Sequence, residues 1–421
     1  MSRKRVVVLG ADGYLGWPTS LHLSAEGHDV IAADSLVRRR WDRDCGTASL
    51  VPIRAMPSRI ARWREVSGRT IGWRRLDLLD AGALSAFLEE IRPDAIVHFA
   101  EQRSAPFSMI DRHHAAVTQY NNVIGTLNLL FAIRDSVPEC HLIKLGTMGE
   151  YGTPDIAIEE GFITIEHEGR SDRLPFPKLP GSFYHLSKVH DSHNIHFACR
   201  TWGLRSTDLN QGIVYGCSTD EMAGDAGLAT RFDYDAIWGT VLNRFCAQAA
   251  IGLPMTVYGE GGQTRGLLDI RDTVACIRIT LDNPPDPGEY RVFNQFTQQF
   301  TVLELAERVR AARAEQGMET AISHLANPRV ERERHFYEAK HQSLLDLGLR
   351  PHHLGDTLID SVIGTVEKHR SRIRPALLDL PDVDWRFGRR GAVPRRFKPV
   401  LVSREGRGGD EEVGISAHSA G

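Results

Sequence analysis

The stretch Arg5-Val-Val-Val-Leu9-Gly10-Ala-Asp-Gly13-Tyr-Leu-Gly16 decides the fold class of this chain. Its first half is a run of apolar, mostly β-branched residues, typical of a strand buried on both faces of a parallel sheet. Its second half spaces three glycines as G-x-x-G-x-x-G, and a helical pattern follows over residues 14–26. Such glycines let the backbone approach a pyrophosphate at a helix N-terminus. The stretch therefore predicts a nucleotide-binding strand–turn–helix unit.

A second predicted strand, residues 29–33, ends in Asp34. An acid about 20 residues after the glycines can accept hydrogen bonds from both ribose hydroxyls and repels a 2′-phosphate, which favours NAD. The arginine run at residues 38–40 leaves the alternative open that a 2′-phosphate is bound there. A solvated helix start, or contacts to the pyrophosphate, are the other interpretations of this run.

Predicted strands near residues 71–76, 94–100, 141–145 and 204–209 alternate with predicted helices, among them 81–91, 110–135 and the helix that carries Tyr184. This alternation predicts an α/β fold with a Rossmann-type, doubly wound parallel sheet. Ligands bind beyond the carboxyl ends of the strands in such a sheet, where Asp77, Ala100 and Thr147 fall. We expect residues 1–214 to form this NAD-binding domain, including the catalytic helix.

The regular alternation weakens after residue 214. We expect residues 215–384 to form mainly a smaller α/β lobe for substrate, with helices at 238–251, 271–281 and 301–315. Its expected strands lie at residues 255–258, 267–270 and 291–294. Residues 385–421 are polar, rich in Arg and Gly and without apolar periodicity, so we expect a disordered tail.

The composition argues against several protein classes. A hydrophobic fraction of 42%, a charged fraction of 25% and a net charge of −3 fit a globular protein and do not suggest nucleic-acid binding. The six cysteines are scattered without a C-x-x-C pair, so we expect neither disulfides nor a metal site, and a reducing cytoplasm fits. We expect no leader sequence and no membrane helix, because no apolar run approaches roughly 20 residues.

The segment Gly181-Ser-Phe-Tyr184-His-Leu-Ser-Lys188 holds a tyrosine and a lysine at the spacing Y-x-x-x-K. Positions four apart share one helix face, so the Lys188 ammonium can lie near the Tyr184 phenol and lower its pKa. A phenolate can take a proton from a sugar hydroxyl while a hydride leaves the same carbon. Alone, this spacing also occurs by chance in surface helices; the glycine turn and Thr147 favour the hydride-transfer interpretation.

These features together resemble the extended short-chain dehydrogenase/reductase family, which works mostly on nucleotide sugars, over about residues 5–370. Longer strings, such as residues 145–154, 184–194 and 261–271, resemble the UDP-sulfoquinovose synthase family within it. The resemblance implies C–S bond formation from UDP-glucose and sulfite to give UDP-6-sulfoquinovose. The implied steps are C4 oxidation with NAD as hydride acceptor, loss of water across C5–C6, sulfite addition at C6 and re-reduction at C4.

The resemblance also implies roles for individual residues. The implied catalytic residues are Thr147, Tyr184, Lys188, Glu150 and His185. The implied cofactor-binding residues are Gly10, Asp12, Gly13, Tyr14, Leu15, Gly16, Asp34, Ser35, Arg38, Arg39, Asp77, Leu78, Ala100, Asn121, Tyr184 and Lys188. The implied substrate-binding residues are Arg103, Thr147, Gln211, Arg244, Gln263, Thr264, Arg265, Asn294 and Arg329.

Sugar-nucleotide dehydratases carry an Asp-Glu pair directly after the threonine, where this chain has Met148 and Gly149. We therefore expect Glu150, helped by His185, to transfer the protons at C5 and C6. The alternative for Glu150 is a structural hydrogen bond to a loop. Arg103 is the candidate for the sulfite side of the site, and the other arginines suit the diphosphate.

Two other functions remain open at this stage. One is a UDP-sugar 4-epimerase or 4,6-dehydratase on the same scaffold, and the other is a non-catalytic NAD-sensing regulator. The family further implies a homodimer formed through helices at about 110–135 and 182–202. A separate sulfite-delivery protein, and the use of the sulfosugar in a lipid, a glycan or a small metabolite, are also left open.

Overall fold

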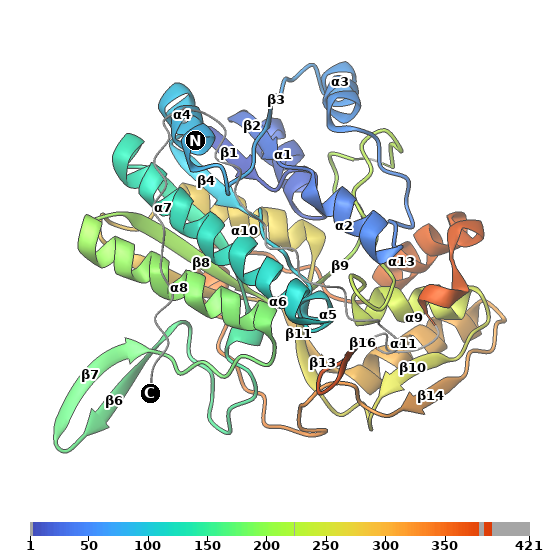
Figure 1. Cartoon of the computed structure of the whole chain (residues 1–421). Coiled ribbons are helices and arrows are strands. Elements are labelled where there is room, and N and C mark those ends of the chain that lie inside the picture. The colour runs from blue at the N-terminus through green and yellow to red at the C-terminus, as the bar shows by residue number, and fades with distance from the viewer. Residues whose placement is uncertain (1–2, 223, 379–382, 390–421) are drawn as a thin grey trace, which may run out of the picture. The chain divides into compact units, whose positions relative to one another are not determined.

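A seven-stranded parallel sheet forms the centre of the molecule (Figure 1). The computed structural model describes residues 3–222, 224–378 and 383–389. In spatial order the strands are β12 (Tyr290–Gln295), β8 (Arg205–Gln211), β5 (His141–Thr147), β4 (Ala95–His98), β1 (Arg5–Leu9), β2 (Asp29–Asp34) and β3 (Gly72–Arg75). All neighbouring pairs are parallel. The predicted Rossmann-type sheet is confirmed.

Helices cover both faces of this sheet (Figure 1). On one face lie α4 (Ala81–Ile91), α7 (Gly125–Ser136) and α8 (Phe183–Trp202), and on the other lie α1 (Gly16–Ala25) and α10 (Ile270–Asp282). The residues of β1 alternate between the two cores: Val7 and Leu9 pack on the first, Val6 and Val8 on the second. Each such buried side chain stabilises the fold by roughly 1.5–3 kcal/mol, which explains the unbroken apolar run.

The turn after β1 requires glycine at residue 10. Gly10 has a φ of +83°, and a Cβ there would lie 2.6 Å from the carbonyl carbon of Phe99. The turn therefore passes directly over the end of β4, and α1 begins at Gly16, two residues after the predicted start. This close approach brings the first turn of α1 to the carboxyl edge of the sheet.

The predicted helix at 110–135 is interrupted by one π-helical turn. It consists of α6 (Arg112–Gln119), η1 (Tyr120–Ile124) and α7, preceded by α5 (Ala105–Ser108). Within η1, Asn122 binds the backbone N–H and C=O of Gln102 and donates to Ser187 Oγ at 2.9 Å. The π turn thus links the end of β4 to the helix that carries Tyr184, a common use of such turns at functional sites.

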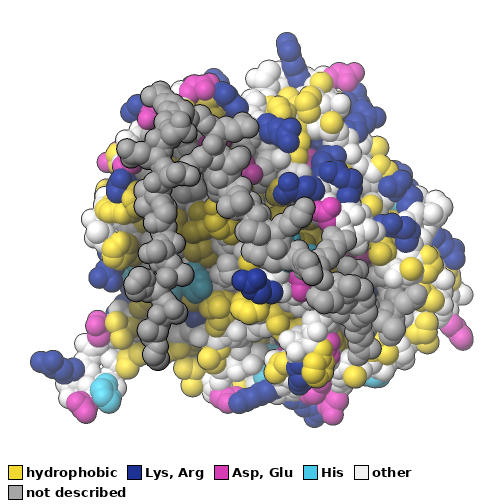
Figure 2. Space-filling view, in the orientation of Figure 1, with side chains coloured by type: hydrophobic (Ala, Val, Ile, Leu, Met, Phe, Trp, Pro, Cys, Tyr) yellow, Lys and Arg dark blue, Asp and Glu magenta, His cyan; other side chains and the backbone are white. Residues whose placement is uncertain are grey.

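Two insertions extend the first half of the chain. One holds α2 (Val37–Cys45) and α3 (Met56–Ser67). The other follows the short helix η2 (Met148–Glu150) and forms the hairpin β6 (Phe162–His167) and β7 (Arg170–Pro175), which the sequence did not predict. Figure 2 shows charged and histidine side chains at its tip, where His167 and Glu168 are both more than four-fifths exposed.

A second group of elements packs around its own apolar core. Its sheets are β9 (Ile213–Tyr215) with β11 (Thr264–Asp269) and β13 (Gln298–Thr301), and β10 (Met255–Tyr258) with β14 (Ile322–Leu325). Its helices are α9 (Val241–Ala250), α11 (Val302–Glu315) and α13 (Asp356–Lys368), followed by the short η3 (Arg370–Arg372) and η4 (Pro375–Leu377). Helix α9 begins later than the predicted residue 238, because Asp235 Oδ1 accepts the N–H groups of Ile237 and Trp238 in a turn.

Not all of residues 215–384 belong to this second group. Strand β12 pairs with β8 at the edge of the main sheet, the short α12 (Ser343–Asp346) contributes Leu344 to the α1/α10 core, and α10 covers the same face. Residues Met1–Arg390 form one compact unit, so the division at residue 214 remains a prediction.

Ordered structure continues past the predicted boundary at residue 385. Strands β15 (Val383–Asp384) and β16 (Gly388–Arg389) form a hairpin, and the Trp385 N–H donates to the Pro328 carbonyl at 2.9 Å. The rest of the expected tail, residues 390–421, lies outside the described residues. Among the helices that are described, none has the length and hydropathy needed to cross a membrane.

Candidate active site

Two cavities adjoin at the carboxyl edge of the main sheet. The first has a volume of about 240 Å³ and lies over the glycine turn; the second, of about 410 Å³, lies between this edge and the second group of elements. Thr147 at the end of β5 and Tyr184 in the first turn of α8 line both cavities. These two side chains therefore stand where two ligands would meet.

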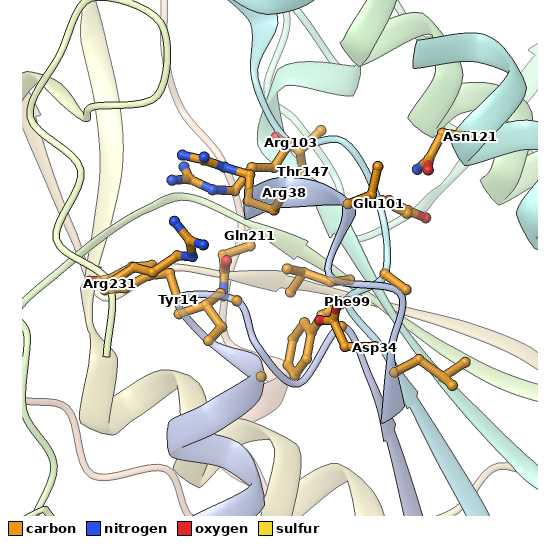
Figure 3. Close-up of a pocket in the computed structure, with 18 of the residues that line it drawn as sticks. Tyr14, Asp34, Arg38, Phe99, Glu101, Arg103, Asn121, Thr147, Gln211 and Arg231 are labelled. Atoms are coloured by element: carbon orange, nitrogen blue, oxygen red, sulfur yellow. The ribbon is translucent and has the colours of Figure 1, made fainter. Parts of the chain in front are cut away.

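Most of the predicted cofactor-binding residues line the first cavity. They are Gly10, Gly13, Tyr14, Leu15, Gly16, Asp34, Ser35, Arg38, Asp77, Leu78, Ala100, Asn121, Tyr184 and Lys188. Figure 3 shows Arg38, Arg103 and Thr147 together in the upper part of this cavity, with Asp34 apart from them. The strand ends thus bring together residues that are up to 178 positions apart in the chain, from Gly10 to Lys188.

Asp34 is held at the end of β2 by backbone donors. Its carboxylate accepts the N–H of Asp12 at 2.9 Å and the N–H of Leu36 at 2.6 Å. Burial, with the neighbouring Asp12, raises the pKa of Asp34 to about 6. A carboxylate has about four acceptor sites, so two remain for ribose hydroxyls.

Asp12 and Arg39 do not line the first cavity. The Asp12 carboxylate is buried and forms ion pairs with Arg39, Arg59 and Arg231, with 2.7 Å between Arg39 Nε and Asp12 Oδ2. Arg38 instead stacks 3.8 Å above the Trp238 ring and pairs with Asp42. Of the arginine run, the side chain that lines the cavity is therefore Arg38, whereas Asp12 and Arg39 belong to an ion cluster and their predicted cofactor contacts stay a prediction.

Tyr184 and Thr147 are joined by a hydrogen bond between their side chains. Burial raises the pKa of Tyr184 to about 12, while Lys144, Arg103 and the Thr147 hydrogen bond lower it in part. Desolvation of the phenolate therefore outweighs the nearby cations, and the lowering of this pKa expected from Lys188 stays a prediction.

Lys188 pairs with Glu101, a residue that the sequence analysis missed. Its ammonium forms an ion pair with the Glu101 carboxylate and donates to the Leu145 carbonyl at 2.5 Å. Burial lowers the pKa of Lys188 to about 8. Glu101 directly follows Ala100 at the end of β4 and lines the first cavity, so its position after the strand was the available signal.

Glu150 lies behind the cavities and lines neither of them. It is fully buried, with Oε2 3.1 Å from Lys178 Nζ and Oε1 3.5 Å from Lys144 Nζ. Burial opposes its ionisation, but these two lysines outweigh burial and lower the pKa of Glu150 to about 2. Its position favours the structural alternative, and the proton-transfer role expected for Glu150 stays a prediction.

His185 lines the second cavity beside Thr147 and Gly149. Its Nδ1 forms a hydrogen bond with Ser182 Oγ at 3.1 Å, while its other edge packs on Gly149. Burial, together with Arg329 and Arg265, lowers the pKa of His185 to about 4. The ring is therefore neutral near pH 7 and can accept a proton.

The second cavity contains a group of cations. Arg244 donates to the Tyr258 hydroxyl at 3.1 Å, and Arg265 pairs with Glu331 at 2.5 Å. The predicted substrate residues that line this cavity are Arg103, Thr147, Gln211, Arg244, Gln263, Thr264, Arg265 and Arg329. The lining also includes Tyr258, Glu331, Trp238 and Trp385, which the sequence analysis missed and for which no motif gave a signal.

Asn294 is the exception among the predicted substrate residues. It is buried near the end of β12, and its Nδ2 donates to the carbonyls of Lys340 and Glu159 at 2.7 and 3.3 Å. It lines neither cavity, so its predicted contact with substrate stays a prediction.

Arg103 lies between the two cavities and lines both. It pairs with the buried carboxylate of Asp233 and donates to the Trp238 carbonyl at 3.2 Å. Its side chain is 37% exposed, so it remains accessible to an anion entering from the second cavity.

The donor set of the first cavity fits NAD. It offers a carboxylate with free acceptor sites at the end of β2, a glycine turn at the start of α1, and the Tyr184 and Lys188 pair at the other side. Within the described ranges, no three His, Cys, Asp or Glu side chains are grouped as metal ligands.

Comparison with known proteins shows which family shares this architecture. Residues 6–294 match the model of the NAD dependent epimerase/dehydratase family. UDP-glucose 4-epimerases from Bifidobacterium longum and Thermotoga maritima share the fold, with TM-scores of 0.65 and 0.63, 19% and 18% identity, 88% and 86% of this chain covered, and 100% and 99% of theirs.

Two curated relatives are much closer in sequence. The chain is 56% identical to the chloroplastic UDP-sulfoquinovose synthase of Spinacia oleracea over 91% of its own length and 80% of the relative. It is 41% identical to the UDP-sulfoquinovose synthase of Sulfolobus acidocaldarius over 91% of its length and 98% of the relative. The chain therefore belongs to the NAD-dependent epimerase/dehydratase family, with NAD as its cofactor, and within that family to the UDP-sulfoquinovose synthases.

Proposed function

We propose that this protein converts UDP-glucose and sulfite into UDP-6-sulfoquinovose and water. The observation that carries the proposal is the hydrogen-bonded pair of Thr147 and Tyr184 at the junction of the two cavities. A sugar in the second cavity would present its C4 hydroxyl to this pair. The names of the two UDP-sulfoquinovose synthases described above support the choice of product.

In the first step Tyr184 accepts the proton of the C4 hydroxyl as a hydride leaves C4. Bound NAD supplies a reversible acceptor and donor for that hydride. Thr147 donates a hydrogen bond to the same oxygen, and Lys188 would hold the ribose of the bound cofactor. The resulting C4 ketone acidifies the C5 proton.

In the second step His185 takes the C5 proton and returns a proton to the departing C6 hydroxyl, so that water leaves. His185 suits this role because it is neutral near pH 7 and lines the second cavity beside Thr147. The sulfur of hydrogen sulfite then adds to C6 of the enone, the proton of hydrogen sulfite passes through His185 to C5, and the hydride returns to C4 while Tyr184 gives back its proton. Atoms balance, since one hydroxyl is replaced by one sulfonate.

Arginines divide the anionic groups between them in this proposal. Arg103 holds sulfite near C6, because it lines both cavities at the junction. Arg244, Arg265 and Arg329 hold the UDP diphosphate, for which the planar guanidinium is well shaped. The indole of Trp385 lies over Arg329, with 5.4 Å from the guanidinium carbon to the ring centroid, and closes that side of the cavity.

The experiment that tests the function is mass spectrometry of the purified protein incubated with UDP-glucose, with and without sulfite. We expect a UDP-sulfohexose mass only in the incubation that contains both UDP-glucose and sulfite. An unchanged UDP-hexose mass calls for NMR of the sugar and points to an epimerase. Loss of water without sulfite incorporation points to a 4,6-dehydratase, and no change in either assay, despite bound NAD, favours a non-catalytic sensor.

We further propose that the protein acts as a homodimer through α6, α7 and α8. Large apolar side chains on these helices and on the adjoining η1 are exposed: Tyr120, Phe131, Phe183 and Phe197, with exposures of 46%, 44%, 45% and 59%. Light scattering on the eluting protein tests this, with a charge at Phe197 expected to give the monomer.

We also propose a cellular compartment for this protein. We propose a reducing cytoplasm, which the six free cysteines support. The Spinacia relative carries the word chloroplastic in its name, so the compartment differs among relatives. A sulfite-delivery protein is the remaining partner that we propose, and free sulfite at increasing concentration replaces it in the assay.

A further inference from the structure

A buried ion network lies behind the carboxyl end of β5, outside both cavities. Its centre is Lys144, whose side chain is fully buried. Lys144 Nζ lies 3.2 Å from Asp208 Oδ2, 3.5 Å from Glu150 Oε1 and 3.0 Å from Ser192 Oγ. The same ammonium donates to the backbone carbonyl of Lys188 at 3.4 Å.

Strand geometry explains why these groups meet. Successive side chains of a strand point to opposite faces, so Lys144 shares a face with Leu142, which packs in the core beneath α7 and α8. Lys144 and Asp208 are register partners on the adjacent parallel strands β5 and β8. Asp208 also accepts from Ser192 Oγ at 2.7 Å and from the Tyr290 hydroxyl at 2.6 Å.

The network holds the backbone of Thr147. The Glu150 carboxylate accepts the Thr147 N–H at 3.4 Å, and Thr147 Oγ1 accepts the Gly149 N–H at 3.2 Å, which together close a capping box over η2. Lys144 holds one oxygen of that carboxylate and Lys178 the other. The position of Thr147 therefore depends on a side chain that is itself fixed by a buried cation.

The network also holds the helix that carries the other catalytic groups. The carbonyl of Lys188 accepts from Lys144 one turn below the Tyr184 backbone, and Ser192 on the next turn contacts both Lys144 and Glu150. Helix α8 and strand β5 are thus joined by Lys144 at the level of the active site. A shift of either element would change the distance between Thr147 and Tyr184.

We propose that Lys144 is a positioning residue for hydride transfer: anchored by Asp208, it fixes Thr147 through Glu150 and fixes the Tyr184 and Lys188 turn of α8 through the Lys188 carbonyl. This goes beyond the proposed function, which assigns no role to the network, and its kinetic test rests on that function. Buried ion networks seldom add stability over apolar residues of similar volume, so the distinct contribution of Lys144 is geometric.

Lys144 has a second effect on Tyr184, through charge. Burial raises the pKa of Tyr184, Lys144 is the leading group that lowers it, and Glu150 raises it again. The groups that act on the phenol are Lys144 and Thr147 of β5, Glu150 of η2 and Arg103 after β4, and the His185 ring of α8 packs against the Tyr184 ring. Loss of the Lys144 charge should therefore raise the pH at which Tyr184 becomes an effective base.

The test compares the double variant Lys144→Met/Asp208→Asn with wild type and with Lys340→Met, which removes an exposed lysine paired with Glu159. The double variant removes one positive and one negative charge together, so the net charge of the network is unchanged. We expect kcat of the double variant to fall by about tenfold or more at each pH at which both proteins are folded, with the KM for UDP-glucose within about twofold.

The control Lys340→Met should keep kcat within about threefold of wild type, because an exposed ion pair contributes little. Thermal unfolding of all three proteins checks that the double variant folds. A double variant that folds like wild type and has the wild-type kcat would overturn the proposal.

Hydrogen–deuterium exchange gives a readout that needs no turnover. Amides of residues 147–151 and 184–192 should exchange at least about tenfold faster in the double variant, with residues 5–9 of β1 unchanged. Unchanged exchange at Thr147 refutes the positioning role even if the rate falls. A wild-type protein without turnover refutes the proposed function instead, and the exchange result still decides the role of Lys144.

Discussion

The imidazole of His185 packs directly on the α-carbon of Gly149. A Cβ built on Gly149 would approach Cδ2 and Nε2 of that ring closer than 3.0 Å, a separation that real Cβ atoms essentially never show. Gly149 occupies the position of the second acid of the dehydratase pair. The absence of a side chain at Gly149 therefore gives His185 its place in the second cavity.

Gly149→Ala is expected to displace the His185 ring from the cavity. We predict a fall in kcat of about tenfold or more for sulfite incorporation, because general acid–base catalysis contributes about 10²–10⁴-fold and depends on geometry. The measurement is the rate of UDP-sulfohexose formation by mass spectrometry. Gly82→Ala, in the first turn of α4 with its nearest neighbour at 3.7 Å, is the matched control. Equal rates for both variants would contradict the prediction.

Tyr184→Phe should reduce kcat by about 10²–10⁴-fold, since the base for the C4 hydroxyl is lost. The pKa of Tyr184 is raised to about 12 by burial, so the phenolate fraction grows as pH rises toward that value. Wild-type kcat should therefore increase with pH across the range in which the protein stays folded, and the residual rate of the variant should lose this rise. A wild-type kcat that falls as pH rises from 6 to 9 would contradict the assignment of Tyr184 as the base.

Asp34→Ala should weaken NAD binding by about tenfold and narrow the preference for NAD over NADP, because the acceptor for the ribose hydroxyls is removed. The pKa of Asp34 is about 6, so the wild-type affinity should also fall as pH drops through 6 and the carboxylate is protonated. Calorimetric titration with each cofactor measures both effects. Asp29→Asn, at the other end of β2 and paired with Arg5 on the surface, serves as control.

Arg103→Met should raise the KM for sulfite by about tenfold or more while the dissociation constant for UDP stays within about twofold. The physical reason is that Arg103 lies at the junction of the cavities, whereas Arg244, Arg265 and Arg329 line the second cavity alone. Initial rates over a sulfite series, together with calorimetric titration of UDP, separate the two. The control is Arg278→Met, which removes an arginine paired with Asp282 on α10. Equal weakening of UDP binding and sulfite binding would indicate that Arg103 contacts the diphosphate instead of sulfite.

Asp191→Asn should change how stability depends on pH. Burial, with Glu150 and Asp208, raises the pKa of Asp191 to about 7 against an unfolded value near 3.8. Between those pH values the native protein binds a proton that the unfolded chain does not, so this group lowers stability as pH rises from 4 to 7. In denaturant unfolding, the free energy of unfolding of the variant should increase relative to that of wild type as pH rises from 4 to 7. Curves of stability against pH that run parallel for the two proteins would show that Asp191 is ionised in the folded protein across this range.

The sequence alone determined the fold class and the cofactor cavity. The apolar run of β1, the glycine turn and Asp34 are local features, and in a parallel sheet every strand end must meet at one edge. Once the alternation of strands and helices is known, Gly10, Asp34, Ala100 and Thr147 have to lie near one another. Their grouping follows from chain connectivity and needs no knowledge of packing.

The tertiary structure decided which way the side chains at those ends point. Asp12 and Arg39 lie within the predicted stretches, yet they pair with each other beside the cavity. Glu150 follows Thr147 by three residues, yet its carboxylate turns back onto Lys144 and Lys178.

These directions depend on partners from distant elements, such as Asp208 opposite Lys144 and Glu101 opposite Lys188. A buried charge must find a counter-charge or pay a large desolvation penalty, so each of these side chains turns to whichever partner the assembled sheet brings within reach. A sequence pattern names the residues at a strand end, but the partner that fixes each one exists only after the strands have come together.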